Sequence, residues 1–303
     1  MVEELFSTQT YTYEEVLREC LKYFKNDELA ATTWINKYAI KDKEGNFLEL
    51  TPNDMHQRMA KEFARMEAKY ADRTAESDGL SEYGQTREPL TEERIFQLFK
   101  DFKYSIPQGS VMAALGNDQM IASLSNCVVV PPVYDSYGGI LFTDQQLVQL
   151  FKRRCGVGVD LSELRPKNAQ VSNAAGTTTG AVSFMERFSN TTREVAQNGR
   201  RGALMLTIDI AHPDVEDFIS SKTNENQITN FNISVCITDA FMRAVELGEE
   251  YELYNPRTGA NAGTLDARMV FENDSISNLA HQLGFFATIG QPSGGRSACR
   301  TQQ

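Results

Sequence analysis

Ser123-Leu-Ser-Asn-Cys127-Val-Val-Val-Pro-Pro132, followed one helix later by Arg154-Cys-Gly-Val-Gly-Val-Asp160, is the part of the sequence that decides the fold. The first stretch sets one cysteine at the head of a β-branched run, a composition that favours a strand. The second stretch is rich in glycine, and we interpret it as a turn whose backbone amides can approach an anionic ligand closely. Together they indicate redox chemistry on a phosphorylated substrate.

The residues around these stretches favour an α/β fold with parallel strands. Apolar, strand-like runs lie at 124–130, 203–210 and 230–237. Amphipathic helices are predicted between them, at about 140–154 and 180–197. Alternation of this kind is typical of parallel strands joined by crossover helices. Asn255-Pro-Arg-Thr-Gly259 predicts a turn.

Residues 1–100 are predicted to form a helical region. Thr12 and Glu15 match a capping box ahead of a periodic apolar pattern, and Thr51 has the position of a second N-cap. The polar, acidic stretch 71–90 is interpreted as a surface loop or insertion. The helical region therefore precedes the α/β part of the chain.

The composition excludes several classes of protein. The chain has 303 residues and a formal net charge of −11, with 41 acidic and 30 basic residues, which argues against a general nucleic-acid binder. No run of eighteen apolar residues and no basic leader with an apolar core are present, so neither a membrane span nor secretion is expected. The five cysteines lack paired spacing, which suits a reducing compartment, and we expect a cytoplasmic protein.

Cys127 and the glycines near it each allow two interpretations. A lone cysteine in an apolar run is commonly a buried structural thiol, and spacing alone favours that interpretation over a redox role. Gly156 and Gly158 could let a phosphate or a ribose approach, although glycine pairs are also common at ordinary bends. Neither feature decides the chemistry alone.

Two further motifs leave alternatives open. Segment 197–202 sets Arg200 and Arg201 between glycines, and it could be a cationic loop that contacts a nucleotide or an ordinary solvated turn. His212 and Glu216 have the spacing of a metal-binding pair on a helix, but no third ligand is suggested, so no metal site is expected.

Taken together, the motifs resemble those of the catalytic (large) subunit of ribonucleotide reductase, in order and spacing, from about residue 95 to 271. They are Ser125-Asn-Cys127, Asp135-Ser136, Arg154-Cys-Gly-Val-Gly158, Leu164-Arg-Pro166, Thr179-Gly180, Ser183-Phe-Met185, Gln197 with Arg200-Arg-Gly-Ala203, His212-Pro-Asp214 and Asn232-Ile-Ser-Val235. The upstream helices look like those of a bacterial member that depends on adenosylcobalamin. Each motif is short, but their combination is specific.

The resemblance implies a fold and an activity. Residues 101–271 would form the first half of a ten-stranded α/β barrel with an effector site, after the helical region 1–100. The activity would be reduction of ribonucleotides to 2'-deoxyribonucleotides by radical chemistry, with adenosylcobalamin as cofactor and a thioredoxin-like protein as reductant. A homodimer would form through the helices near 140–154 and 180–197.

The resemblance also implies roles for individual residues. Cys127 would be the first of two cysteines that reduce the substrate and become a disulfide. The ribonucleotide would be bound by Ser125, Asn126, Cys127 and Gly156. A deoxynucleotide or ATP effector would be bound by Asp135, Ser136, Tyr137, Arg165, Ser172, Gln197, Arg200 and Arg201. Among these, Arg201 is expected to contact the base, whereas Ser172 stands where some members have an arginine.

Residues 272–303 depart from the family pattern, because the radical-bearing cysteine and the second redox cysteine are expected beyond residue 271 and are not recognised there. We therefore expect a truncated chain with an atypical tail that is inactive alone, and Cys299 receives no catalytic role. The radical source, cobalamin or a metal-bearing subunit, stays open at this point. A hypothesis of a different class is a non-catalytic module that binds the nucleotide effector or assists assembly. An unrelated oxidoreductase on a doubly wound sheet is disfavoured, since no GxGxxG fingerprint follows the first strand.

Overall fold

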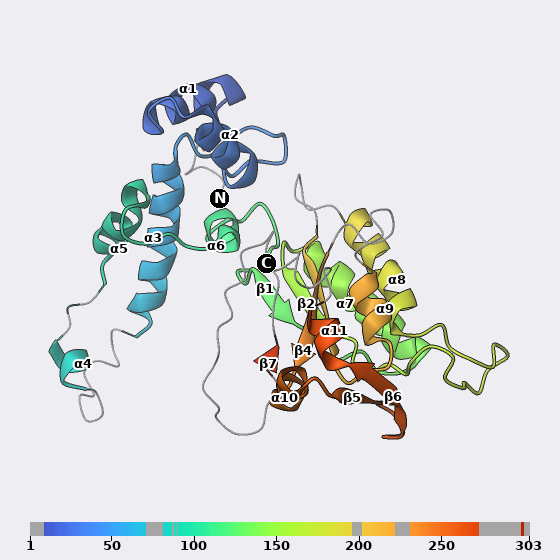
Figure 1. Cartoon of the computed structure of the whole chain (residues 1–303). Helices are drawn as coiled ribbons and strands as arrows, with labels where there is room; N and C mark the ends of the chain where they lie inside the picture. The colour runs from blue at the N-terminus through green and yellow to red at the C-terminus, as the bar shows by residue number, and fades with distance from the viewer. Residues whose placement is uncertain are drawn as a thin grey trace. The chain divides into compact units, whose positions relative to one another are not determined.

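The structure is a computed structural model that describes residues 9–70, 81–86, 88, 90–195, 202–221, 231–272 and 298–299. The chain separates into two compact units, Met1–Asn126 and Cys127–Gln303, and each has an apolar core of its own (Figure 1). The sequence pattern predicts that the second domain starts at residue 101, whereas the contacts place residues 101–126 with the helices.

The first unit is helical, as the sequence predicts. Its helices are α1 (Tyr13–Tyr23), α2 (Glu28–Lys37), α3 (Pro52–Ala68), α4 (Glu82–Thr86), α5 (Glu92–Phe99) and α6 (Gly109–Ala114), with a short 3-10 helix η2 (Lys100–Phe102). The capping box of α1 is confirmed, because Glu15 N donates to Thr12 Oγ1 and Thr12 N donates to Glu15 Oε2. Trp34, Met55 and Met59 lie in the apolar core of this unit.

A buried ion pair fastens α3 inside the first unit. Arg58 Nε lies 2.8 Å from Glu49 Oε1, and the exposed fractions of the two side chains are only 13% and 6%. Glu49 Oε2 also accepts a hydrogen bond from Ile40 N. The Arg58 guanidinium donates to the carbonyls of Met112 and Leu115 at the end of α6, where helix carbonyls lack partners of their own. The pair therefore joins three segments of the unit.

The second unit is built on a sheet with strand order β1-β2-β3-β4-β7. Its strands are β1 (Cys127–Val129), β2 (Gly156–Asp160), β3 (Leu204–Asp209), β4 (Asn232–Ile237) and β7 (Ala298–Cys299). Strands β1 to β4 are parallel, and β7 is antiparallel to β4. The predicted α/β fold with a parallel sheet is therefore confirmed.

Within the described residues, the helices that connect the parallel strands are α7 (Tyr137–Phe151), α8 (Ala181–Glu194) and α9 (Val215–Ser220). The strands follow one another in chain order, so every crossover advances in the same direction. Because such crossovers are right-handed, all three helices belong on one face of the sheet. Figure 1 shows them gathered on the same side of β1–β4.

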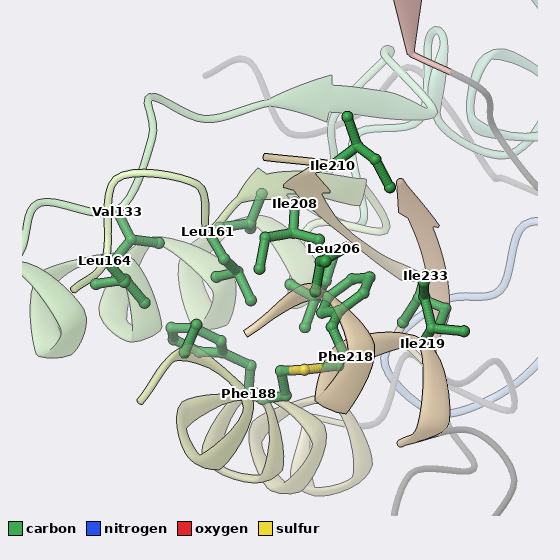
Figure 2. Packing of buried hydrophobic residues seen from close by; sticks show 14 of the residues in the cluster. Val133, Leu161, Leu164, Phe188, Leu206, Ile208, Ile210, Phe218, Ile219 and Ile233 are labelled. Carbon is green, nitrogen blue, oxygen red and sulfur yellow. The ribbon is translucent and has the colours of Figure 1, made fainter. Parts of the chain in front are cut away.

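The apolar core of the second unit lies between the sheet and these helices. One apolar cluster contains Leu206, Ile208 and Ile233 of the strands together with Phe188 and Phe218 of the helices (Figure 2). All five are buried, with exposed fractions of 6% or less. Side chains alternate along a strand, so this arrangement sends the residues between them to the opposite face.

One sequence-based interpretation is wrong. Residues 156–160, interpreted as a glycine-rich turn, form strand β2, which pairs with β1 and with β3 along its length. Glycine normally weakens a strand, but here β2 is bordered on both sides, and its ladder of backbone bonds compensates. Gly156 and Gly158 therefore form part of a sheet surface, and they do not form a phosphate-binding loop.

The remaining elements form a hairpin and two helices: α10 (Asp239–Leu247), β5 (Glu250–Tyr254), β6 (Asn261–Asp266) and α11 (Ala267–Glu272). Strands β5 and β6 pair antiparallel, and the turn predicted at 255–259 connects them. Gly259 N donates to Asn255 O over 2.8 Å, which closes this turn.

Candidate active and effector sites

On the sheet face opposite the helices, a cysteine of β1 lies next to glycines of β2, and polar side chains follow at the ends of β2 and β3. Parallel pairing aligns Cys127 with Gly156 and aligns Val129 with Gly158, so these four residues share that face. A Cβ added to Gly158 would lie 3.4 Å from Val129 Cγ2, at ordinary contact distance. Gly156 is buried and Gly158 is half-buried, so the exposed cysteine stands in register with a glycine that other parts of the chain cover.

Cys127 is exposed, and the interpretation of a buried structural thiol, which spacing alone favoured, is wrong. Among the strands that the structure describes, β1 lies at the edge of the sheet and pairs with β2, so its first residue is not enclosed by them. By contrast, Cys20 and Cys155 are buried. Burial raises the pKa of the Cys20 thiol to about 12, which keeps it protonated and unreactive at neutral pH.

We therefore expect Cys127 to react with iodoacetamide at least about tenfold faster than Cys20 or Cys155, since alkylation needs an accessible thiolate. Peptide mapping by mass spectrometry after timed quenching assigns the rate to each cysteine. Equal protection of all three thiols in the folded chain would contradict the exposure of Cys127.

Two of the predicted substrate residues belong to the first unit. Asn126 Oδ1 accepts a hydrogen bond from Ser110 N over 2.8 Å, and Ser110 lies in the first turn of α6. Helix N–H groups at this position have no partner within the helix, so the Asn126 side chain acts as a cap. Ser125 is exposed, and its N donates to Ser123 Oγ. The other two predicted residues, Cys127 and Gly156, are paired in the second unit.

A polar cluster at the carboxyl ends of β2 and β3 was missed by the sequence analysis. Asp160 Oδ1 accepts hydrogen bonds from Ser162 Oγ over 2.6 Å and from Thr207 Oγ1 over 3.1 Å. Ser162 Oγ in turn accepts from Asp209 N. Polar residues that follow an apolar run at a spacing of two could have signalled it. Carboxyl ends of parallel strands are where ligands bind in many α/β proteins.

The predicted effector residues Asp135, Ser136 and Tyr137 lie where α7 begins. Ser136 is the N-cap, and its Oγ accepts from Gly139 N over 3.0 Å. The exposed side chain of Tyr137 follows it. A Cβ on Gly139 would lie 2.4 Å from Tyr134 O, so only glycine fits this tight entry to the helix.

Arg165 meets Asp135 in a two-point contact. Its Nε lies 2.8 Å from Asp135 Oδ2, and its backbone N donates to Asp135 Oδ1 over 3.2 Å. The exposed fractions of the two side chains are 17% and 18%, so water screens the pair weakly. Arg165 Nη1 also donates to Gln170 O, which ties the exposed segment containing Ser172 to the same place. The structure thus brings Arg165 to the start of α7.

The remaining predicted effector residues, Gln197, Arg200 and Arg201, lie outside the described residues. Their segment precedes β3 in the chain, and the effector-binding role expected of it stays a prediction.

The His212-Pro-Asp214 motif holds the segment that carries Arg165. His212 Nδ1 accepts from Asp214 N, so Nε2 carries the proton and donates to Leu164 O over 2.7 Å. The buried Asp214 carboxylate accepts hydrogen bonds from Lys167 N and from Ala181 N, each 2.9 Å long. The motif therefore fixes the backbone on both sides of Arg165 and also the start of α8.

The possible metal pair is not supported, because His212 is buried in those contacts while Glu216 is exposed. Within the described ranges, no three His, Cys, Asp or Glu side chains gather in a way that could hold a metal ion. Nor does any helix in those ranges combine the length and apolar character needed to cross a membrane.

Helices α7 and α8 are fastened to each other by Asp144. This residue is 9% exposed, and its carboxylate accepts from Arg187 Nη2 over 2.8 Å and from Thr191 Oγ1 over 2.5 Å. On its outer side α7 exposes Leu141 and Phe142, with exposed fractions of 50% and 59%. These helices thus form one layer with an apolar outer patch.

The fold and the sites define the class: an α/β domain with an exposed thiol on the edge of a parallel sheet. Residues 125–275 match the barrel domain of ribonucleotide reductase. A vitamin B12-dependent ribonucleoside-diphosphate reductase of Mycobacterium tuberculosis is 33% identical over 259 residues, covering 84% of this chain and 34% of that protein. One from Thermoplasma acidophilum is 30% identical over 279 residues, covering 78% and 36%. The chain belongs to the ribonucleotide reductase family, and its recognition from sequence is confirmed.

The match to other members of the family is shorter. The large subunit of the ribonucleoside-diphosphate reductase of Caenorhabditis elegans is 28% identical over 139 residues, which is 44% of this chain. The vitamin B12-dependent relatives match over longer stretches of this chain. It spans about a third of the length of these relatives.

Proposed function

We propose that this chain takes part in the reduction of ribonucleotides to 2'-deoxyribonucleotides, with Cys127 as one of the reducing thiols. The observation that carries the proposal is the exposed thiol of Cys127, which heads strand β1 in register with Gly156, in a family of ribonucleotide reductases. Replacement of the 2'-hydroxyl by hydrogen consumes two electrons and releases water. Two thiols supply those electrons when they become a disulfide, so a second cysteine must complete the pair.

The chain's own residues would bind and orient the substrate. Asn126 and Ser125 precede the thiol directly in the chain, and Gly156 pairs in register with Cys127 on the neighbouring strand. The exposed position of Cys127 on the edge strand β1 would let the sugar approach its sulfur. A thioredoxin-like protein would then reduce the disulfide through the same exposed edge.

Adenosylcobalamin is proposed as cofactor because the relatives are named vitamin B12-dependent. When bound, it supplies radical chemistry that side chains lack. The histidines in the described ranges do not fit a cobalt ligand, because His56 and His212 have exposed fractions of 0% and 2%. We therefore assign no residue to the cofactor and derive no step through it.

We further propose that a deoxynucleotide or ATP effector binds at the start of α7. Asp135, Ser136, Tyr137 and Arg165 converge there, which supports the proposal. Ser172, Gln197, Arg200 and Arg201 would complete the site. The apolar outer patch on α7 supports a homodimer through α7 and α8, and the chain-order parallel sheet supports the first part of a ten-stranded barrel.

The proposal is tested with a chimera in which residues 9–271 replace the matched part of the Mycobacterium tuberculosis reductase. We expect the chimera to convert CDP to dCDP with adenosylcobalamin and a dithiol, measured by chromatography. Cys127→Ser should abolish product, because an alcohol cannot form the disulfide. Cys236→Ser, a cysteine on the same sheet face, should retain activity. Undiminished product from the Cys127→Ser chimera would contradict the assigned role.

A second candidate function is that of a module that binds the effector without turnover. The Asp135–Arg165 ion pair favours it, because both residues belong to the second unit. Saturable binding of dTTP to the 303-residue chain, together with an inactive chimera, would support it. From the 303-residue chain alone we expect binding and no dCDP, as the sequence analysis predicts.

A further inference from the structure

Arg257 joins the predicted effector residues from a distant part of the chain. It lies in the turn of the β5–β6 hairpin, and its Nη1 lies 3.2 Å from Asp135 Oδ2, 122 residues away in sequence. The turn itself is well determined by hydrogen bonds, since Asn255 Oδ1 accepts from Arg257 N over 3.0 Å and Asn255 O accepts from Gly259 N over 2.8 Å. The hairpin therefore presents this side chain in a defined position.

The contact leaves a surplus of positive charge at the start of α7. Asp135 Oδ2 accepts from Arg165 Nε and from Arg257 Nη1, so one carboxylate faces two guanidinium groups. The N-terminus of a helix adds a partial positive charge of its own. In a chain with a formal net charge of −11, this place is locally cationic and attracts an anion.

The two arginines differ in exposure and in how many of their N–H donors are used within the protein. The Arg165 side chain is 17% exposed, and it is occupied by Asp135 and Gln170 O. The Arg257 side chain is 60% exposed, and Asp135 is the acceptor that the structure gives it. A guanidinium group has five N–H donors, so Arg257 keeps donors that face solvent. The Asp135–Arg165 ion pair is thus held in place by its own contacts, whereas the exposed Arg257 side chain is available to bind a ligand.

We propose that Arg257 is a binding residue of the effector site and contacts the phosphate groups of a nucleoside triphosphate. This inference rests on the proposed effector site at the start of α7. The planar guanidinium group suits two-point binding of phosphate oxygens, and the bond to Asp135 directs it toward the place where Ser136 and Tyr137 begin the helix. Binding there would link the β5–β6 hairpin to occupancy of the site.

The test measures dTTP binding to the full 303-residue chain by isothermal titration calorimetry at two salt concentrations. We expect Arg257→Gln to weaken dTTP binding about tenfold and to flatten its salt dependence, because a charge-assisted bond is lost. Arg257→Lys keeps the charge but loses the planar two-point geometry, so it should keep the salt dependence of the wild type and recover only part of the affinity. Arg243→Gln removes the same charge from an exposed position on α10 and should leave the affinity unchanged.

The outcomes separate the two proposals. Saturable dTTP binding by the wild type and equal binding by Arg257→Gln overturns the role of Arg257 and leaves the effector site standing. An equal loss in Arg243→Gln also overturns it, because the effect would then be one of overall charge. No binding by the wild type overturns the effector site together with this inference. Melting curves of each variant confirm that the compared chains are folded.

Discussion

Replacing Gly180 by alanine will lower the free energy of unfolding of the second unit by about 2–4 kcal/mol. Gly180 has φ +87° and ψ 173°, a backbone conformation essentially restricted to glycine. An added Cβ would also lie 2.6 Å from Asp214 Oδ2 and 2.8 Å from Lys167 N. The methyl group must therefore push apart the contacts that the Asp214 carboxylate makes. Urea denaturation followed by circular dichroism measures the loss.

Gly176→Ala is the matched control for this prediction. Gly176 has φ +72°, but nothing lies within 4 Å of an added Cβ, so only the backbone cost of about 1 kcal/mol applies. Equal destabilisation by the two substitutions would show that the contacts of Gly180 do not matter. Because Asp214 also holds the segment that carries Arg165, the Gly180 variant should bind dTTP more weakly even at temperatures where it is folded.

Replacing Arg58 by methionine will destabilise the first unit by about 3–5 kcal/mol, because the change leaves a buried charge without its partner. Glu49 is 5% exposed. Its burial is the largest influence on the pKa of its carboxyl group and raises that pKa. The positive charge of Arg58 opposes that shift. Its removal also deprives the carbonyls of Met112 and Leu115 of their donor. Urea unfolding at pH 7 measures the effect.

The control for Arg58→Met is Arg65→Met on the same helix. Arg65 forms an ion pair with Glu62, but its side chain is 57% exposed, and such pairs contribute little. The difference in free energy of unfolding between Arg58→Met and the wild type should become smaller as the pH falls toward the ordinary pKa of glutamate. A carboxyl whose folded pKa is raised favours the folded state below its unfolded pKa, and this contribution is lost as the pH rises. A deficit that is constant with pH would show that Glu49 is not its source.

Much of the local structure could be predicted from sequence, because it depends on neighbouring residues. Thr12 and Glu15 form the predicted capping box, and the turn at 255–259 connects a hairpin. Strands at 204–209 and 232–237 lie within the predicted apolar runs. Strand β2 was missed because glycine has low strand propensity, and pairing with two neighbours overrode that preference.

The sites divide in the same way. The motifs identified the family and nominated Asp135 and Arg165, which the fold brings into contact. Arg257 could not be found, since it lies in a surface turn far from Asp135 in sequence, and no local pattern records that contact. The same limit applies to the exposure of Cys127, which depends on its place on an edge strand.

By itself, the sequence determined the family, the alternation of strands and helices, and the residue types available for chemistry. Only the tertiary structure decided that the Cys127 thiol is open to solvent, that Asp160 gathers polar partners and that two arginines share one carboxylate. The physical reason is the distance along the sequence over which each effect acts. Propensity and periodicity act over a few residues, whereas burial and charge pairing depend on which distant segments the sheet and its hairpin bring together.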